Sequence, residues 1–378
     1  MDFTLNREQE MLRKAVRDFA EAKVAPRVPE LDAKGEPPKD IVQQMGQMGF
    51  SGLLHAKTYG GSGLGHLARV ILMEELSRIY PSLGFVYETG NLFPYILETF
   101  ATEEQKQKLL PDLAKANRSS AFALTEATGG SDPSAMTTEA VLTADGDYIV
   151  DGRKRFITMA QEADVLGFAA RSGKGFNILY VERGMPGWEV TRREPRPGLR
   201  CIPVNELAFT NCRVPKENLV GPEGKGLVGA ITGISVIART GAAAVALGAA
   251  QGAYEAALKF CKERILYGAP IANLQAIQFA LAEMSTDIAA ARWLCYYPAV
   301  LLDQGKSARE VGVDIARAKL ITVDVAIRVA TKAQQVMGAY GQSPEYRVEL
   351  FLRDALELLS AGGTQEIMNV TIGRAITS

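Results

Sequence analysis

The sequence predicts a three-part fold in which a β-rich middle is flanked by two helical parts. Apolar residues recur at helical spacing in the first third of the chain and again in its long, alanine-rich last part. The middle instead contains short β-rich runs separated by turn residues. At 378 residues the chain has room for about two or three domains. We expect an all-helical N-terminal domain over residues 1–117, a middle β domain over 118–222 and a C-terminal helical bundle over 223–378.

The first part carries clear signals for helix starts. Asn6 followed by Gln9 is a capping box, and the apolar stripe behind it is expected to end at Pro26. Thr102 with Gln105 is a second capping box. Between these two signals, helical spacing predicts helices over residues 40–48, 67–80 and 91–100.

The middle part contains a hairpin signal. The turn sequence Ala144-Asp145-Gly146-Asp147 stands between two β-rich runs, residues 140–143 and 148–150. Further β-rich runs cover residues 176–181 and 188–192. In the last part, alanine-rich helical periods cover residues 236–261, 275–303 and 308–339. Because no long linker separates the three parts, we expect them to pack as one unit.

Charge and cysteine content exclude several classes of protein. Lys and Arg number 42 against 43 Asp and Glu, a net charge of −1, so no nucleic-acid partner is indicated. The four cysteines show no CxxC spacing, which favours a reduced, cytoplasmic protein. The chain opens with no charged and then apolar segment and has no run of about 18 apolar residues, so we expect no membrane insertion.

Several common catalytic motifs are missing. The two histidines, His55 and His66, have no acidic or cysteine companions at ligand spacing, so no metal site is expected. No Gly-x-Ser-x-Gly surrounds a serine, and no Gly-x-Gly-x-x-Gly opens a Rossmann site. The polar, glycine-broken segment at residues 124–132 stands out instead. It either presents backbone N–H groups to phosphate oxygens or simply joins two domains.

Four separated signatures occur in the order typical of one family. They are residues 121–126 followed by Gly130-Ser131-Asp132, residues 152–158, Glu263-Arg264 with Tyr267-Gly268 and Gln275, and Gln335 through Gly338 to residues 363–367. With these signatures the chain resembles the acyl-CoA dehydrogenase family of flavoproteins over essentially its whole length. The resemblance implies a helical N-terminal domain, a β-barrel middle domain and a C-terminal four-helix bundle that builds an oligomer interface.

The resemblance also implies FAD as the cofactor. Thr125 would bond the pyrimidine end of the flavin, Ser131 would meet the pyrophosphate, and Thr158 would lie at N5, where hydride arrives. Phe156 would pack against the ring where the family usually has tryptophan. Arg264 and Gln275 of one subunit would bind the FAD of another, which implies a homo-oligomer, expected to be a tetramer. The expected cofactor-binding residues are Phe122, Leu124, Thr125, Gly130, Ser131, Phe156, Thr158, Arg264, Tyr267, Gln275, Gln335, Gly338, Thr364 and Glu366.

The chain departs from the family at the catalytic base. Dehydrogenation of a thioester needs a carboxylate that removes the α-proton while hydride leaves the β-carbon. Most relatives have that glutamate at the position of Gly362, and a minority have it at the position of Ala238, before Arg239. Both usual bases are therefore missing. The backbone N–H of Gly362 is still able to polarise the thioester carbonyl, as in the family.

A replacement base is expected in the segment Tyr87-Glu88-Thr89-Gly90-Asn91, taken here as the loop before a helix. In the family this segment lines the acyl pocket, where few polar neighbours would raise the pKa of Glu88 toward neutrality. The alternative is that Glu88 is a pocket-floor carboxylate with no catalytic task. The Asn91 amide is not a base, so it either positions the substrate or marks a disabling exchange of an aspartate. Relatives that oxidise alicyclic carboxyl-CoA thioesters are similar in drawing a carboxylate from this region.

The leading hypothesis is an FAD-dependent acyl-CoA dehydrogenase with a relocated base. It would act on a cyclic or branched acyl-CoA thioester and pass electrons to an electron-transfer flavoprotein or similar acceptor. Arg239 is the candidate contact for the CoA phosphates, with an arginine that bridges helices as the alternative. The competing hypotheses are a catalytically silent or reductive subunit, motivated by the loss of both bases, and a flavin monooxygenase or oxidase on the same fold.

Overall fold

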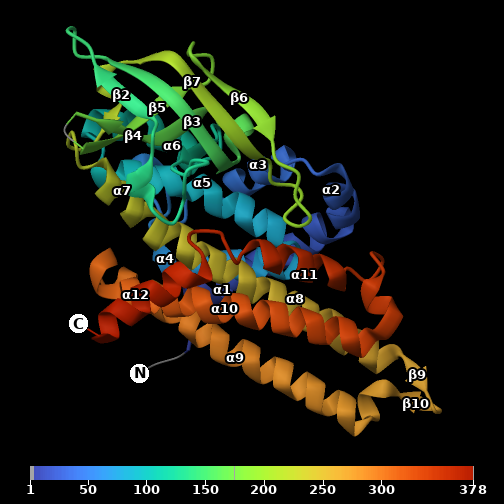
Figure 1. Ribbon diagram of the computed structural model, residues 1–378. Helices are drawn as coiled ribbons and strands as arrows, with labels where there is room; N and C mark the ends of the chain where they lie inside the picture. The colour runs from blue at the N-terminus through green and yellow to red at the C-terminus, as the bar shows by residue number, and fades with distance from the viewer. Residues whose placement is uncertain (1–3, 174, 378) are drawn as a thin grey trace.

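The computed structural model describes residues 4–173 and 175–377, and its N-terminal part is helical as predicted (Figure 1). α1 (Arg7–Phe19) begins with the predicted capping box, in which the side chains of Asn6 and Gln9 each accept from the other residue's backbone N–H. The expected stop at Pro26 is wrong. The chain stays helical through η1 (Ala20–Val24), η2 (Ala25–Arg27) and α2 (Val28–Lys34), because proline is tolerated in the first turn of a helix.

The helix that carries the candidate base starts earlier than predicted. α5 begins at Pro81 rather than near residue 91, so the segment from Tyr87 to Asn91 lies inside a helix and is not a loop. Gly84 and Gly90 break the apolar period of this stretch, and burial on several sides stabilises it as a helix despite them. The second capping box, Thr102 with Gln105, is confirmed. The other elements of this part are α3 (Lys39–Gln47), η3 (Lys57–Tyr59), α4 (Gly65–Ile79), α5 (Pro81–Phe100) and α6 (Glu103–Ala114).

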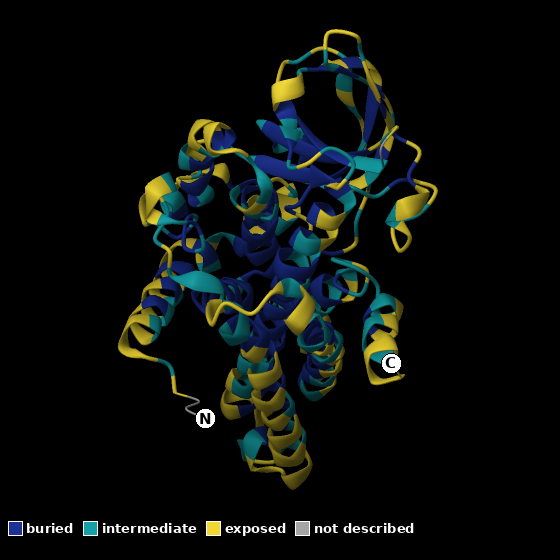
Figure 2. Cartoon of the chain, turned by 90° about the vertical axis from the view of Figure 1, so that its left-hand side faces the viewer, coloured by how far each residue is buried: buried dark blue, intermediate teal, exposed yellow. Residues whose placement is uncertain are grey.

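The middle part is an 8-stranded sheet with the order β6-β7-β3-β2-β4-β5-β8, and β1 pairs with β4. The predicted hairpin is present as β2 and β3, antiparallel with Leu142 opposite Tyr148. The sheet curls round on itself (Figure 2), but β6 and β8 do not pair among the described residues, so the closed barrel is not confirmed. The strands are β1 (Ser120–Ala123), β2 (Glu139–Leu142), β3 (Tyr148–Thr158), β4 (Val165–Ser172), β5 (Gly175–Glu182), β6 (Trp188–Arg193), β7 (Val204–Val214) and β8 (Leu219–Val220).

The last part is again helical, and the long helices lie where the alanine-rich periods predicted them. α8, α9 and α10 pack along one another, while α11 and α12 pack on α10 (Figure 1). The β9–β10 hairpin projects at the end of the bundle farthest from the sheet. The elements are α7 (Gly226–Gly233), η7 (Ile234–Arg239), α8 (Thr240–Glu263), β9 (Ile265–Leu266), β10 (Ala269–Pro270), α9 (Gln275–Asp303), α10 (Ala308–Met337), η9 (Gly338–Gln342), α11 (Val348–Glu357) and α12 (Gln365–Thr377).

One continuous helical stretch, Gly226–Glu263, is long and apolar enough to cross a membrane by length and composition alone. Of its most apolar window, 78% is buried inside the protein, where α4 and α10 pack against α8. The central helix of a protein core has the same composition, and this stretch occupies that place in the fold.

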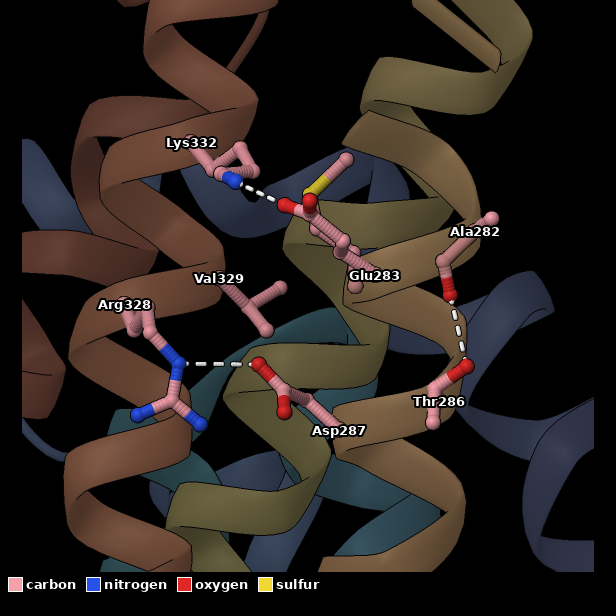
Figure 3. A pocket seen from close by; sticks show the side chains of 8 residues that line it. Ala282, Glu283, Thr286, Asp287, Arg328, Val329 and Lys332 are labelled. Atoms are coloured by element: carbon pink, nitrogen blue, oxygen red, sulfur yellow. Dashed lines mark hydrogen bonds and ion pairs between the residues drawn. The ribbon is translucent and has the colours of Figure 1, made fainter. Parts of the chain in front are cut away.

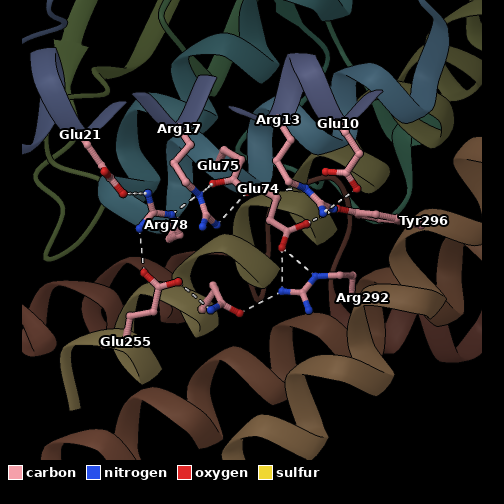
Figure 4. Close-up of polar contacts among 11 residues, drawn as sticks. Glu10, Arg13, Arg17, Glu21, Glu74, Glu75, Arg78, Glu255, Arg292 and Tyr296 are labelled. Atoms are coloured by element: carbon pink, nitrogen blue, oxygen red, sulfur yellow. Dashed lines mark hydrogen bonds and ion pairs between the residues drawn. The ribbon is translucent and has the colours of Figure 1, made fainter. Parts of the chain in front are cut away.

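The first and last parts share one apolar core, and buried ion pairs tie them together (Figure 4). Glu74 and Glu75 are adjacent and buried on α4. Arg292 of α9 lies 2.8 Å from Glu74, and Arg17 of α1 lies 2.9 Å from Glu75. Because a buried carboxylate is stable only with such partners, α4 is held in one register against the bundle. That register also places α5, which follows α4 directly.

Candidate active site

Thr125, Phe156 and Thr158, three of the predicted flavin residues, lie where the loop after β1 meets the end of β3. The Arg155 N–H donates to the Thr125 carbonyl at 2.9 Å, which joins the loop after β1 to β3. An irregularity in the β3–β7 register falls between Lys154 and Ile157, and within it Phe156 adopts φ +60°. Such a bulge re-aims a side chain, and the Phe156 ring is 54% exposed.

The surroundings of that ring fit the flavin that the resemblance implies. Thr125 and Thr158 are half-buried, and Ser131 is exposed. Among the described residues the three hydroxyls make no hydrogen bond. Free hydroxyls beside an exposed aromatic face suit a planar ring with polar edges, which stacks on the face and is hydrogen-bonded at its rim. A side chain at position 130 would crowd Thr125, because a Cβ at Gly130 would lie 3.1 Å from the Thr125 Cγ2.

A buried ion pair fixes the loop that carries Thr125. Lys154 is fully buried, and its Nζ donates to Glu126 Oε1 at 2.8 Å and to the Leu124 carbonyl at 3.2 Å. The other Glu126 oxygen accepts from the backbone N–H and the hydroxyl of Thr137, at 2.6 and 2.7 Å. These bonds hold the pKa of Glu126 at about 2 against the cost of burial. The sequence pattern did not single out either charge of this pair.

The other expected cofactor residues do not all meet the first group. Phe122 is buried, with its ring stacked on Phe93, so its side chain belongs to the core, and Leu124 packs against the same cluster. A second group lies at the far end of the bundle, where the Arg264 guanidinium is 5.4 Å from the Tyr340 ring and Tyr267 is 94% exposed. The remaining members are Gln275, at the start of α9, and Gln335 and Gly338, at the end of α10. Thr364 and Glu366 lie elsewhere, at the start of α12, where Gln365 between them contacts Leu320 and Asp324 in the middle of α10.

The two positions of the usual bases are in contact. A Cβ at Gly362 would lie 3.1 Å from the backbone carbon of Ala238. Gly362 adopts φ +66° and Gly363 φ +114°, a backbone that favours glycine at both positions. The Arg239 Nε donates to the Gly362 carbonyl at 3.0 Å, and its Nη1 donates to the Ser235 hydroxyl at 3.0 Å. Arg239 therefore bridges η7 and the Gly362 loop. This fits a bridging arginine, the alternative to a contact with the CoA phosphates.

Glu88 contacts the helical stretch of η7 and α8 close to Ala238, which is itself in contact with Gly362. A Cβ at Gly241 would overlap the Glu88 Cγ, so the carboxyl side chain rests directly on α8. Gly241 is three residues, about 4.5 Å of helix rise, beyond Ala238. Glu88 is 3% exposed, its Oε1 has no hydrogen-bond partner, and its Oε2 accepts from the Thr89 hydroxyl at 3.3 Å. Burial raises the pKa of Glu88 to about 7, with Arg69 opposing the rise.

Asn91 faces a different space. It lines a cavity of roughly 570 Å³ between α5, α3 and the end of β3, together with Tyr87 and Met159, whereas Glu88 does not line it. The Asn91 Nδ2 donates to the Tyr87 carbonyl at 2.8 Å, and its Oδ1 has no hydrogen-bond partner. The structure thus separates the two candidates of the sequence analysis onto neighbouring faces of α5.

Two further polar side chains close to the site were not found from the sequence. Arg69 is fully buried on α4, and it donates to the Thr240 hydroxyl and, at 3.5 Å, to the Val236 carbonyl. Lys319 is fully buried on α10 and donates to the loop around Gly362. Their only signal in the sequence is a cation within an otherwise apolar helical period, which is too common to nominate a site.

The comparisons with known proteins show the family and its three domains. Models of the N-terminal, middle and C-terminal domains of acyl-CoA dehydrogenases match residues 6–117, 121–212 and 224–377. The chain is 38% identical over 382 residues to the short-chain-specific acyl-CoA dehydrogenase of Clostridium acetobutylicum, with 100% of both chains covered. The solved butyryl-CoA dehydrogenase of Megasphaera elsdenii superposes with a TM-score of 0.96 at 35% identity, also over 100% of both chains.

A third relative is the subunit CarC of the caffeyl-CoA reductase–Etf complex of Acetobacterium woodii, 34% identical over 97% of each chain. The chain belongs to the acyl-CoA dehydrogenase family. It is an FAD-dependent oxidoreductase that acts on the CH–CH bond of an acyl-CoA thioester.

Proposed function

We propose that Glu88 is the catalytic base of this acyl-CoA dehydrogenase. The observation that supports it is the contact of Glu88 with Gly241, three residues along the helix from Ala238, which in turn contacts Gly362. Glu88 therefore lies within about one helical turn of both places where the family carries its glutamate. With a pKa raised to about 7 by burial, it is half ionised near neutral pH, as a general base requires.

The proposed reaction uses three parts of the chain. The thioester carbonyl accepts from the Gly362 N–H, which stabilises the negative charge that develops on its oxygen. Glu88 takes the proton from carbon as the C–H bond breaks, and becomes a neutral carboxyl. Thr125, Ser131, Phe156 and Thr158 would hold FAD, which would supply the acceptor for the hydride that leaves the neighbouring carbon. Loss of one proton and one hydride gives the unsaturated thioester.

The substrate class that fits this displaced base is an alicyclic carboxyl-CoA thioester. Glu88 reaches the substrate from a point about one helical turn away from the usual position at Gly362. A compact ring presents several C–H bonds at that depth, whereas a short straight chain presents its α-proton near Gly362. Asn91 lines the cavity on the next face of α5, so its free Oδ1 would contact only a part of the ring that extends into that cavity.

We propose a homo-oligomer, a tetramer, as the active form. Phe156 and Thr158 lie on the sheet, whereas Arg264 and Tyr267 flank or belong to the β9–β10 hairpin at the opposite end (Figure 1). One chain cannot bring both groups to the same flavin, so a second subunit would supply the latter group. The outer face of α9 supports such an assembly, because several large apolar side chains are exposed along it, namely Phe279, Trp293, Leu294 and Tyr297.

The neighbouring face of α9 and α10 is polar and suits the rim of that interface. Ion pairs of Arg328 with Asp287, at 2.8 Å, and of Lys332 with Glu283 bridge the two helices (Figure 3). They border a cavity of roughly 450 Å³ that is separate from the flavin residues. For the electron acceptor we propose an electron-transfer flavoprotein, since one relative is named as a subunit of an Etf complex. We further propose a cytoplasmic location, which the four free, buried cysteines fit.

An anaerobic titration tests this function. The yellow holoenzyme is mixed with straight, branched and alicyclic acyl-CoA thioesters while the flavin absorbance band is recorded. We expect the band to bleach with an alicyclic thioester and to change little with the straight-chain ones. Bleaching by straight-chain thioesters alone would contradict the substrate class. Spectral shifts without bleaching by any thioester would favour the silent or reductive alternative.

Restoring the usual base is expected to harm the protein. Gly362→Glu places a Cβ 3.1 Å from the backbone of Ala238 and forces a residue with a side chain into φ +66°. We expect a loss of about 1–3 kcal/mol in the free energy of unfolding, measured by chemical denaturation, and no gain in flavin reduction. Gly373→Glu is the matched control, since a Cβ there meets open space. Wild-type stability with raised activity in Gly362→Glu would show that the loop accommodates a glutamate.

A further inference from the structure

We propose that Lys319 is a positioning residue of the active site, which together with Arg239 fixes the backbone around Gly362 so that the Gly362 N–H faces the thioester carbonyl. The inference rests on the proposed function, because it assigns the donor that polarises the substrate to a loop held by two cations. It concerns the geometry of that donor and is independent of which side chain is the base.

Lys319 reaches the loop from the middle of α10. Its Nζ donates to the Gly363 carbonyl at 2.7 Å, to the Leu359 carbonyl at 3.0 Å and to Gln365 Oε1 at 3.2 Å. An ammonium group has three N–H donors, and these three acceptors use all of them. The acceptors lie on both sides of Gly362, one just after the end of α11 and two at the start of α12. Lys319 therefore ties the two ends of the loop to one point.

The placement of this lysine is costly and so calls for an explanation. The side chain is fully buried, and no carboxylate lies within ion-pair distance of it in the described part of the chain. Burial lowers the pKa of Lys319 to about 8, with the Arg239 guanidinium acting in the same direction. A buried cation whose hydrogen-bond acceptors are all neutral, with the carboxylates of Asp324 and Glu366 acting only at longer range, stabilises a fold less than an apolar side chain of that size would. What the lysine does provide is a fixed orientation for the carbonyls that it binds.

In the part of the chain that the structure describes, the backbone polar groups of Gly362 and Gly363 are all paired except one. The Gly362 carbonyl accepts from Arg239, and the Gly363 carbonyl accepts from Lys319. The Gly363 N–H donates to the Ser360 carbonyl at 3.3 Å. The Gly362 N–H alone among these has no partner within the described residues. Since the two carbonyls cannot turn without breaking bonds to the half-buried Arg239 and the buried Lys319, the free N–H keeps one direction, as a preorganised donor must.

The test compares two ligands that differ only in the carbonyl. Benzoyl-CoA has a thioester oxygen, and S-benzyl-CoA has a CH₂ group in its place, and neither can be dehydrogenated at the ring by proton and hydride loss. Binding to the holoenzyme is followed by the change in the flavin band. In Lys319→Met we expect benzoyl-CoA to bind about tenfold or more weakly and to lose the red shift of its carbonyl absorption, while S-benzyl-CoA binds as in wild type. Substrate-driven flavin reduction is expected to fall about 10²-fold.

Two further variants keep the test decisive. Arg317→Met, on the same helix but in an exposed ion pair with Asp314, is expected to match wild type in every measurement. Lys319→Gln keeps two N–H donors in a neutral, shorter side chain and is expected to show the same split between the ligands with a smaller effect. If Lys319→Met does not fold, Lys319→Gln takes its place in the test.

The outcomes separate this inference from the proposed function. Equal weakening of both ligands, or loss of FAD with no preference between them, would show that Lys319 is only structural. Unchanged binding of benzoyl-CoA in both Lys319 variants would also overturn the inference. If the wild-type holoenzyme binds neither ligand and no thioester bleaches its flavin, the proposed function fails, and the inference fails with it.

Discussion

Replacing Glu88 by glutamine is expected to slow substrate-driven reduction of the flavin by about 10²–10⁴-fold, the usual contribution of a general base. Glutamine has the same shape and keeps the contact with Gly241, so the site stays filled. It cannot accept a proton from carbon, because its amide is not basic. The measurement is anaerobic stopped-flow reduction with the thioester that bleaches the wild-type enzyme, and binding of a non-reacting CoA ligand should be unchanged.

A conservative variant separates chemistry from packing. Glu88→Asp retains the carboxylate but shortens its reach by one methylene, so we expect a rate between those of wild type and Glu88→Gln. Asn91→Asp in the Glu88→Gln background asks whether the next turn of α5 is able to supply the base instead. Wild-type rates in Glu88→Gln would leave Glu88 with the role of a pocket-floor carboxylate.

The same exchange is expected to stabilise the protein above neutral pH. Burial raises the pKa of Glu88 from 4.5 to about 7, so the folded chain keeps a proton that the unfolded chain releases between these values. The contribution of Glu88 to stability is therefore fully present below pH 4.5 and is lost as pH rises through about 7. Glu88→Gln does not ionise and escapes this loss. Denaturation at pH 8 should show the variant to be more stable, while wild-type flavin reduction should rise with pH through about 7.

The parts of the fold that were predicted correctly depend on short-range interactions. Both capping boxes involve residues three apart, and the hairpin turn lies between strands that follow each other directly. The start of α5 was missed because two glycines interrupt its period, while burial against α4 and α8 decides its conformation. Closure of the sheet depends on whether β6 and β8 meet, and no local pattern contains that information.

The active site was predicted through the family motifs and only in part through the residues themselves. The positions of Gly362 and Ala238 follow from those motifs, but their contact with each other is a tertiary feature. The same holds for Glu88, whose neighbour Gly241 is more than 150 residues away in the sequence. Lys319 was not found because its acceptors are backbone carbonyls, which carry no side-chain signal. Sequence patterns thus locate the elements of the site, and packing decides which atoms face one another.

Replacing Lys154, the buried cation that fixes the loop carrying Thr125, is expected to destabilise the protein by about 3–5 kcal/mol. Lys154→Met leaves the Glu126 carboxylate buried without its counter-ion, and the Leu124 carbonyl loses a donor. Because Thr125 directly precedes Glu126, we expect the purified variant to hold less FAD as well. The free energy of unfolding and the ratio of flavin to protein absorbance measure the two effects.

The second partner makes this prediction specific to the ion pair. The pKa of Glu126, held at about 2 by Lys154 and its other donors, gives wild type a stability that is present above pH 4.5 and lost as pH falls through about 2. Without Lys154 that pKa rises, so the deficit of Lys154→Met should shrink on acidification. The double variant with Glu126→Gln should recover much of the loss, because no charge remains buried. Lys108→Met, which breaks a more exposed pair with Glu182, should cost at most about 1 kcal/mol, and an equal cost in both variants would contradict the prediction.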